Sequence, residues 1–501
     1  MKTVRTSIIV LFALAIGGCG LFVWRDPRNV LPVGRAAGTG PRFDAEKIIE
    51  HCRTDDGGLV LTLPDCVALA LSRNLSLKAV REEPWKATGD VFAATSAMLP
   101  QVSVSGVYTR IDQATTADFG GQTITISPQD RYKAELSIQQ PVFQSGMAYH
   151  AAEAARIGKR IAELGVETAE EQVAFGVTAS FYEALFTRAG LEVARENLQL
   201  ARAHLDEVKK RLEQGMASRF EELRAQTRVS SMEAREIQAR NQTALKKLGL
   251  LRLVGLPLDK DVELDGTLFS PPGSLPYDKA WSVARRLRTD LYASHLGVEA
   301  MKSQVRSIRG QLLPKLYAYF NWGWEKPSGK SFIAGGGAGY WNGGLSLSLP
   351  LFDGGAAHGR LLKAHASLRQ AQFRLEDLRE EIGLEIRKAI LNLADAAEGV
   401  KMSQKNLRLA REGQRLAKVG YANGVNTQLD VLEADNQLAM AKYGMIQAFF
   451  GHTLAREALN RAMGAVRLLK WRRPAPRDGK KTDGTEAEGE EGSEEEGGEE
   501  G

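Results

Sequence analysis

Alternating apolar and polar residues mark two pairs of short segments along the chain, which is the pattern of strands with two unlike faces. The clearest segment has Tyr132, Ala134, Leu136 and Ile138 on one face, and Lys133, Glu135, Ser137 and Gln139 on the other. Segments 102–105, 316–324 and 345–349 alternate in the same way. Half-apolar strands of about ten residues are typical of outer-membrane barrels. An amphipathic sheet on a soluble core gives the same pattern, so the strands alone predict only hairpins at about 101–140 and 315–350.

Two very long proline-free segments predict helices at about 147–212 and 356–422, followed by shorter helices at about 218–254 and 427–463. The first helix would span about 66 residues, or roughly 100 Å, which a globular domain cannot contain. Its apolar positions recur mostly at intervals of three, four and seven, the spacing of helices packed side by side: Ile157, Ile161, Leu164, Val173, Val177, Leu185, Leu198, Leu205, Val208 and Leu212. With the strands, they predict a helical tube standing on a membrane. A plain coiled-coil rod would leave the strands unexplained.

The same order of elements occurs twice, at a spacing of roughly 210 residues. The hexapeptide at 141–146 returns at 350–355. We therefore predict two repeats, residues 61–258 and 277–466, joined by a proline-containing linker at 259–276. Each repeat consists of a short helix, a β-hairpin, a long helix and a shorter helix. The expected fold class is an α/β membrane protein with a two-fold internal repeat.

Closure of the sheet demands more than one chain. Four strands cannot form a barrel, and lipid tolerates no open sheet edge. The smallest single-chain barrels have about eight strands, so two or three copies of this chain are required.

Ordered motifs in both halves carry a resemblance to a known family. They are Leu99-Pro100 and Leu313-Pro314 before the first strands, the hexapeptide at 350–355, and Tyr421–Gly424 with Asp430–Glu433 at the second helical turn. The chain resembles the outer membrane efflux protein family, the TolC-like channels, over about residues 60–465. The resemblance implies three copies, and hence a trimeric 12-stranded outer-membrane β-barrel continuous with a long periplasmic α-helical barrel of twelve helices.

The resemblance also implies a periplasmic gate at the second helical turn, formed by Asp430, Glu433 and Tyr421, with Glu221 at the matching acidic position of the first turn. Asp430 and Glu433 are three residues apart and share one helical face, so a trimer would carry rings of six carboxylates that favour cations. Glu433 replaces the family's second Asp, and Asn426 stands where a latching Arg occurs in the best-known members. The alternative is that both acids are solvated residues at a helix start.

The N-terminus has the layout of a secretion signal. Lys2 and Arg5 precede an apolar run at residues 8–16, which predicts a signal peptide at 1–18. Ile16-Gly17-Gly18-Cys19 resembles a lipobox, so Cys19 would be the lipidated first residue of an anchored segment at 19–60. The alternative is an uncleaved or differently cleaved segment with an incidental cysteine.

Two further cysteines, Cys52 and Cys66, fall in the expected periplasmic part. A disulfide between them would close about fifteen residues and stabilise the protein by roughly 3 kcal/mol. Unpaired burial of Cys66 is the competing interpretation.

The C-terminal segment 467–501 ends in a predicted disordered tail, with ten acidic residues between Asp483 and Gly501. These acids offset a basic body, which gives the whole chain a formal charge of +5.

No catalytic, cofactor or metal constellation can be assembled from the sequence, because the seven histidines are scattered. Lys and Arg interleave with Glu along the helices, so nucleic acid is not needed to explain the basic body. The sequence predicts a passive, homotrimeric exit channel in the bacterial outer membrane, lipid-anchored and extending into the periplasm. Its partners would be a periplasmic adaptor and an inner-membrane pump, in tripartite efflux or type I secretion. The alternative is a periplasmic adaptor-like or structural coiled-coil protein.

Overall fold

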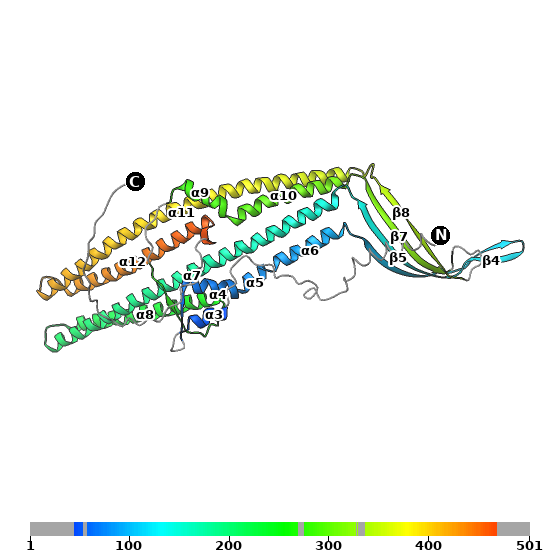
Figure 1. Cartoon of the computed structure of the whole chain (residues 1–501). Helices are drawn as coiled ribbons and strands as arrows, with labels where there is room; N and C mark the ends of the chain where they lie inside the picture. The colour runs from blue at the N-terminus through cyan, green and yellow to red at the C-terminus, as the bar shows by residue number, and fades with distance from the viewer. Residues whose placement is uncertain (1–44, 54–57, 269–274, 327, 329–335, 468–501) are drawn as a thin grey trace, which may run out of the picture.

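The computed structural model describes residues 45–53, 58–268, 275–326, 328 and 336–467. Figure 1 shows an elongated molecule with a β-sheet at one end and two helical turns at the other. Among the described residues, no helix combines the length and the apolar character needed to cross a membrane. The expected signal peptide, the lipidation site Cys19, most of the anchored segment and the acidic tail lie outside the described residues.

Two helices of 67 residues run along most of the molecule, α7 (Met147–Glu213) and α11 (Ala356–Ala422). Each follows a glycine in the left-handed region, Gly146 at φ 76° and Gly355 at φ 90°. Glycine adopts this conformation without the steric cost that a side chain would add. These glycines end the two matching hexapeptides, which therefore form the junctions between strand and helix. Both helices lie within one residue of their predicted ranges.

Shorter helices flank the long ones in two tiers (Figure 1). Near the helical turns, α8 (Arg219–Val254) packs on α7, and α12 (Gln428–Ala462) packs on both α11 and α7. Near the sheet, α6 (Glu83–Ser96) packs on α7, and α10 (Thr289–Gly310) packs on both α7 and α11. The tier near the turns therefore follows the lateral order α8, α7, α12, α11.

The short helix expected at the start of each repeat is divided. α4 (Leu63–Arg73) and α5 (Leu75–Val80) precede α6, and α9 (Tyr277–Leu287) precedes α10. Asn74 separates the first two, because its side-chain oxygen accepts a hydrogen bond from Leu77 N at 3.0 Å and begins a new helix. Its amide nitrogen also donates to Leu253 O at 3.1 Å, which ties the break to the end of α8.

Four antiparallel strands form the main sheet, in the order β2 (Gln101–Arg110), β5 (Asp130–Phe143), β7 (Lys315–Lys326) and β8 (Ala338–Ser348). The central pair, β5 and β7, joins the two halves of the chain. The sheet is open in the described chain, with β2 and β8 at its edges. The connection from β2 to β5, inside the predicted hairpin at about 101–140, contains a second hairpin, β3 (Thr115–Phe119) and β4 (Gln122–Ser127).

The register of the main sheet gives it two chemically different faces. Ser137 lies opposite Asn321, which lies opposite Asn342, and side-chain hydrogen bonds of 2.7 and 2.9 Å connect the three. Since side chains alternate along each strand, the other face is apolar. It carries Val102, Val104, Leu136, Ile138, Phe320, Trp322, Trp324, Trp341, Leu345 and Leu347. In the described chain most of this apolar face is exposed, including Trp341 at 70%.

Each half has its own hydrophobic core near the middle of the molecule. The first lies among α4, α7 and α8 and includes Leu69, Phe181 and Leu251, and the second lies among α9, α10, α11 and α12 and includes Ile382 and Ile386. The predicted linker contributes to the first core, because β6 (Val262–Asp265) pairs in parallel with β1 (Leu59–Thr62). Residues 269–274 of that linker lie outside the described residues.

Cys52 and Cys66 both lie in the first core as buried thiols, and the structure has no disulfide between them. Cys52 follows the short helix α3 (Ala45–His51), and Cys66 lies in α4. Burial, followed by the neighbouring Asp65 carboxylate, raises the pKa of the Cys66 thiol. A buried thiol of high pKa is chemically inert, which agrees with the competing interpretation of unpaired burial.

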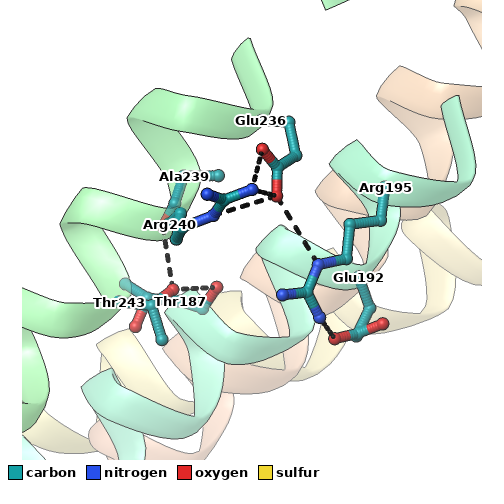
Figure 2. A network of polar contacts seen from close by, with 7 residues as sticks. All are labelled: Thr187, Glu192, Arg195, Glu236, Ala239, Arg240 and Thr243. Atoms are coloured by element: carbon teal, nitrogen blue, oxygen red, sulfur yellow. Dashed lines mark hydrogen bonds and ion pairs between the residues drawn. The ribbon is translucent and has the colours of Figure 1, made fainter. Parts of the chain in front are cut away.

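A charged network holds α8 against α7 beyond the first core (Figure 2). Glu236 of α8 is only 6% exposed, and its carboxylate accepts hydrogen bonds of 2.7 and 2.8 Å from Arg240 Nη2. Arg195 of α7 lies 3.6 Å from the same carboxylate and also pairs with Glu192 at 2.9 Å. These cations lower the pKa of Glu236, the hydrogen bonds from Arg240 first, so the buried carboxylate stays ionised.

A second network fixes the break between α9 and α10. Arg288 pairs with Asp290 through two hydrogen bonds of 2.6 and 3.0 Å, and its third nitrogen donates to Glu385 of α11 at 2.5 Å. The same nitrogen donates to Ala462 O of α12 at 3.1 Å. One guanidinium thus connects three helices of the second half.

Candidate functional site

Two helical turns with the same construction form the end of the molecule opposite the sheet (Figure 1). In each turn the chain reverses through a glycine with positive φ, Gly215 at 72° and Gly424 at 74°. The next residue donates its backbone N–H back to the preceding helix, Met216 to Arg211 O and Val425 to Gly420 O, both at 2.8 Å. Such bonds close helix C-termini and set a tight reversal.

Two of the predicted gate acids belong to capping boxes at these turns. Asp430 accepts from Thr427 N at 2.7 Å and from Thr427 Oγ1 at 2.8 Å, while Asp430 N donates to Thr427 Oγ1 at 3.3 Å. Glu221 has the same relation to Ser218, with a backbone bond of 2.6 Å. The bonds from Thr427 lower the pKa of Asp430. The helix-start interpretation therefore describes the local role of Asp430, and Glu221 has the same local role at the first turn.

Glu433 and Asn426 lie differently. Glu433 is an exposed residue of α12, one turn after Asp430. Asn426 remains within its own turn, where its backbone N–H donates to Gly420 O at 3.2 Å and its side-chain amide donates to Ala417 O at 3.4 Å. The position of the expected latching Arg is thus occupied by a residue that stabilises the turn.

Tyr421 has a partner that the sequence did not reveal. Arg211, in the last turn of α7, donates a hydrogen bond to Tyr421 OH at 2.8 Å, and its guanidinium lies 4.7 Å from the centre of the tyrosine ring. Arg211 also pairs with Glu207 at 2.8 Å. The spacing of Glu207 and Arg211 is that of an ordinary solvated helix pair, so nothing in the sequence distinguished this arginine. The contact connects the two helical hairpins at their tips.

Arg211 and Tyr421 begin a seam of contacts between α7 and the second hairpin. Gln428 Nε2 lies 2.7 Å from His204 Nε2, and Lys442 Nζ lies 2.5 Å from Glu196 Oε2. Burial lowers the pKa of His204, which favours the neutral ring in this contact. Further from the tips, Phe186 stacks on Phe450 at 4.9 Å and packs against Tyr443 at 5.5 Å.

Two other acids near the turns were also missed. Asp435 accepts from Gln414 Nε2 at 2.6 Å and lies 3.6 Å from Lys418 Nζ, so it connects α12 to α11. Glu222, next to the predicted Glu221, is 7% exposed and pairs with Arg219 and Gln226. Glu222 adjoins Glu221 and Asp435 follows Glu433 by two residues, and a single sequence gives no signal that separates the more buried acid from the other.

A cavity of about 610 Å³ opens beside the seam, between α7, α8 and α12. Amide side chains and small residues line much of it, among them Asn197, Gln238, Asn436, Gly190 and Gly444. The described residues contain no group of three or more His, Cys, Asp or Glu side chains placed to hold a metal ion.

Known proteins share this arrangement of long paired helices ending in a small antiparallel sheet. The crystal structure of the CmeC outer membrane channel of Campylobacter jejuni matches 80% of this chain and 85% of its own, with a TM-score of 0.70 and 18% identity. That likeness shows the fold, which is the fold of TolC-like outer-membrane channels.

The sequence belongs to the outer membrane efflux protein family, whose family model matches residues 66–256 and 281–465. The alkaline protease secretion protein AprF of Pseudomonas aeruginosa is 26% identical over 64% of this chain and 68% of its own length. The outer membrane protein TolC of Vibrio cholerae is 21% identical over 78% of this chain and 87% of its own length.

The capping box predicts a local effect at the second turn. Thr427→Ala should weaken the start of α12 by about 1 kcal/mol, which corresponds to roughly fivefold faster amide exchange at residues 428–431. Because the pKa of Asp430 is lowered in the folded protein, its contribution is complete above the unfolded value of about 3.9 and is lost as the pH falls through the folded value. Hydrogen exchange followed by mass spectrometry measures both effects.

Thr427→Ser keeps the hydroxyl and is the matched control, so its exchange should stay close to that of the parent. Equal exchange in the Ala and Ser variants would show that the capping box does not stabilise this turn.

Proposed function

We propose that three copies of this chain form a passive exit channel across the outer membrane and the periplasm, without enzymatic activity. The main support is the open, two-faced sheet joined directly to helices of 67 residues. Its polar face would line a water-filled lumen and its apolar face would contact lipid. Three such sheets would make the twelve-stranded barrel, and the helices would continue the lumen as a tube.

The exposed apolar residues at the sheet end support a membrane location. Val142 and Phe143 are 56% and 55% exposed where β5 meets α7, and Leu351 and Phe352 are 88% and 89% exposed where β8 meets α11. A soluble protein seldom leaves such a concentration of apolar surface uncovered. In the proposed trimer these residues would lie at the periplasmic boundary of the bilayer.

A long apolar stripe on α11 supports ring closure by neighbouring copies. Its residues are each more than half exposed: Leu362, Phe373, Leu384, Leu391, Met402, Leu409 and Leu416. Their spacing of 7 or 11 residues keeps them within about 40° of one another around the helix. The residues of α11 that are buried in the second core, such as Ile382 and Ile386, lie on the opposite side.

The other lateral edge of the chain offers a matching surface. α8 is the first helix in the order α8, α7, α12, α11, and it exposes Leu223, Ile237 and Leu245 along its length. Contact between α11 of one copy and α8 of the next would be heterologous, and such contacts form a closed ring when the rotation between copies allows it.

The helical turns would form the periplasmic gate. In a trimer Asp430 and Glu433 would supply six carboxylates around the axis, which would attract cations. The hydrogen bonds from Thr427 occupy only part of the Asp430 carboxylate, because its two oxygens have several acceptor positions. The same carboxylate can therefore also attract cations. We infer that Arg211 and Tyr421 take the place of the missing latch, since they hold the two hairpins together at their tips. Glu221 would position the first turn.

The partners we propose are a periplasmic adaptor and an inner-membrane pump. Four apolar side chains protrude from the turns, where an adaptor would dock: Met216, Phe220, Val425 and Leu429, with exposed fractions of 49% to 80%. The names of the similar proteins include protease secretion as well as channel functions. We therefore propose that the inner-membrane pump determines whether the channel serves efflux of small molecules or type I secretion.

Lipid anchoring at Cys19 is a further part of the proposal and rests on the sequence Ile16-Gly17-Gly18-Cys19. Mature protein should incorporate labelled fatty acid, and Cys19→Ala should abolish the label while leaving the oligomer assembled, because the barrel is itself an anchor. Unlabelled parent protein would remove the anchor from the proposal.

A periplasmic adaptor-like or structural coiled-coil protein is the alternative. The four-stranded sheet favours the channel, because a coiled-coil rod needs no sheet with an exposed apolar face. One chain also has two helical hairpins, whereas an adaptor would have a single one.

The stripe on α11 predicts which substitutions prevent assembly. Leu391→Glu combined with Leu409→Glu should shift the purified protein from trimers to monomers, because each interface would bury unpaired carboxylates. Light scattering coupled to size-exclusion chromatography in mild detergent measures the mass.

Gln404→Glu is the matched control, since residue 404 is an exposed position of α11 away from the stripe. It should leave the trimer intact. Trimers of unchanged stability in the double variant would rule out this face as the interface.

The gate acids predict the ion selectivity of the channel. Replacing Asp430 with Asn and Glu433 with Gln preserves side-chain shape and removes six negative charges per trimer. We expect a roughly threefold or larger fall in the cation-to-anion permeability ratio at 0.1 M salt. The effect should be smaller at high salt, because screening limits the reach of these charges to about 10 Å at 0.1 M and to less at higher concentrations. Reversal potentials in planar bilayers give this ratio.

Asp377→Asn with Glu380→Gln makes the same change in charge on α11, far from the turns. This control should have a weaker effect, because both acids lie on the same face of α11 as Phe373 and Leu384, toward the neighbouring copy and away from the lumen. Equal shifts in the two double variants would place the constriction elsewhere.

A further inference from the structure

The polar face of the main sheet carries charges of both signs in the half that lies away from the helices. Arg131, Lys133 and Glu135 follow one another on this face of β5, and Glu325 lies opposite Lys133 on β7. Lys315 is on the same face at the other end of β7. The distal half of the face therefore has two positive and two negative side chains in each copy.

Lys133 and Glu135 of β5 form a cluster with a tyrosine of β8, across the intervening strand β7. Lys133 Nζ lies 2.6 Å from Glu135 Oε2, and Tyr340 OH of β8 donates a hydrogen bond to the same oxygen at 2.5 Å. The Lys133 ammonium also lies 5.9 Å from the centre of the Tyr340 ring. A single carboxylate oxygen of Glu135 thus contacts both the Lys133 ammonium group and the Tyr340 hydroxyl group.

A glycine on the intervening strand makes this arrangement sterically possible. Gly323 of β7 lies between Glu135 and Tyr340 in the register. A Cβ at position 323 would be only 2.6 Å from the Tyr340 ring, so any larger residue would force the ring to move. Tyr340 therefore reaches across β7 to Glu135 because β7 has no side chain there.

Stability alone is a weak reason for this cluster. Side chains of Lys133 and Glu135 are 49% and 21% exposed, and exposed ion pairs contribute little to folding because water screens them. Their effect on the electrostatic potential of the adjacent space is larger, since that space would be a water-filled lumen surrounded by a low-dielectric wall.

We propose that Lys133, Glu135 and Tyr340 form a charge-compensating cluster that keeps the distal half of the barrel lumen electrically balanced. This inference rests on the proposed channel function and on the polar face lining the lumen. Glu135 neutralises Lys133 locally, and Tyr340 holds the carboxylate in position. The distal half of the barrel then discriminates little between cations and anions, so charge selection is left to other parts of the channel, the acids at the periplasmic turns above all, and cargo of either sign can pass this half.

The test measures reversal potentials of purified trimers in planar bilayers across a KCl gradient. Glu135→Gln leaves Lys133 without compensation and should move the selectivity toward anions, while Lys133→Met should move it toward cations. Each shift should be roughly threefold at 0.1 M salt, because three charges change near the pore axis within about one screening length. The double variant restores the balance and should return to the selectivity of the parent.

Lys326→Met is the matched control. Lys326 of β7 lies next to Glu325, at nearly the same level of the sheet as Lys133, but it belongs to the apolar face. It removes the same charge as Lys133→Met and should leave the selectivity unchanged. Tyr340→Phe keeps all charges and should also retain the balance, with a smaller shift caused by movement of Glu135.

Failure of this inference differs from failure of the proposed function. Protein that assembles but gives no conductance would overturn the channel itself. A conducting parent whose selectivity is the same in the Glu135 and Lys133 variants would overturn only the cluster. Equal shifts in Lys133→Met and Lys326→Met would also overturn it, because the effect would then come from total charge.

Discussion

Backbone hydrogen bonding at the two sheet edges is the constraint on which the proposed assembly depends. Strands β2 and β8 each have one neighbour in the described chain, and an unpaired edge in lipid would leave a row of polar groups without partners. Only another sheet can satisfy these groups. The number of chains, the continuity of the lumen and the lateral contacts of the helices all follow from this requirement, because the helices continue directly from the strands.

Contacts at both ends of the molecule hold the halves of the chain side by side, in addition to the packing of α10 on α7 between them. At one end, β5 and β7 share backbone hydrogen bonds over most of their length. At the other end, the seam from Phe186 to Arg211 relies on a few polar contacts and two aromatic pairs. The backbone ladder is the more resistant of the two. Motion between the hairpins is therefore expected at the turns, while the sheet keeps its register.

Periodicity was sufficient to predict the long helices, the four strands and the two faces of the sheet, because each depends on spacing within one segment. Contacts between distant segments could not be predicted from periodicity. The pairing of β1 with β6 and the partnership of Arg211 with Tyr421 join residues about 200 positions apart. Asp430 and Glu221 were recognised as acids at the turns. Each follows a Thr or Ser by three residues, which is the spacing of a capping box, so the sequence did carry a signal for their hydrogen bonds to Thr427 and Ser218.

The length of α7 and α11 turns each of them into a lever. A helix of 67 residues measures about 100 Å, so a tilt of 1° at the sheet end displaces the far end by roughly 1.7 Å. A displacement of that size is enough to separate Arg211 from Tyr421, which are joined by a single hydrogen bond of 2.8 Å and a ring contact. A slight rotation near the membrane or at the middle of the molecule would thus be amplified into an aperture change at the tips.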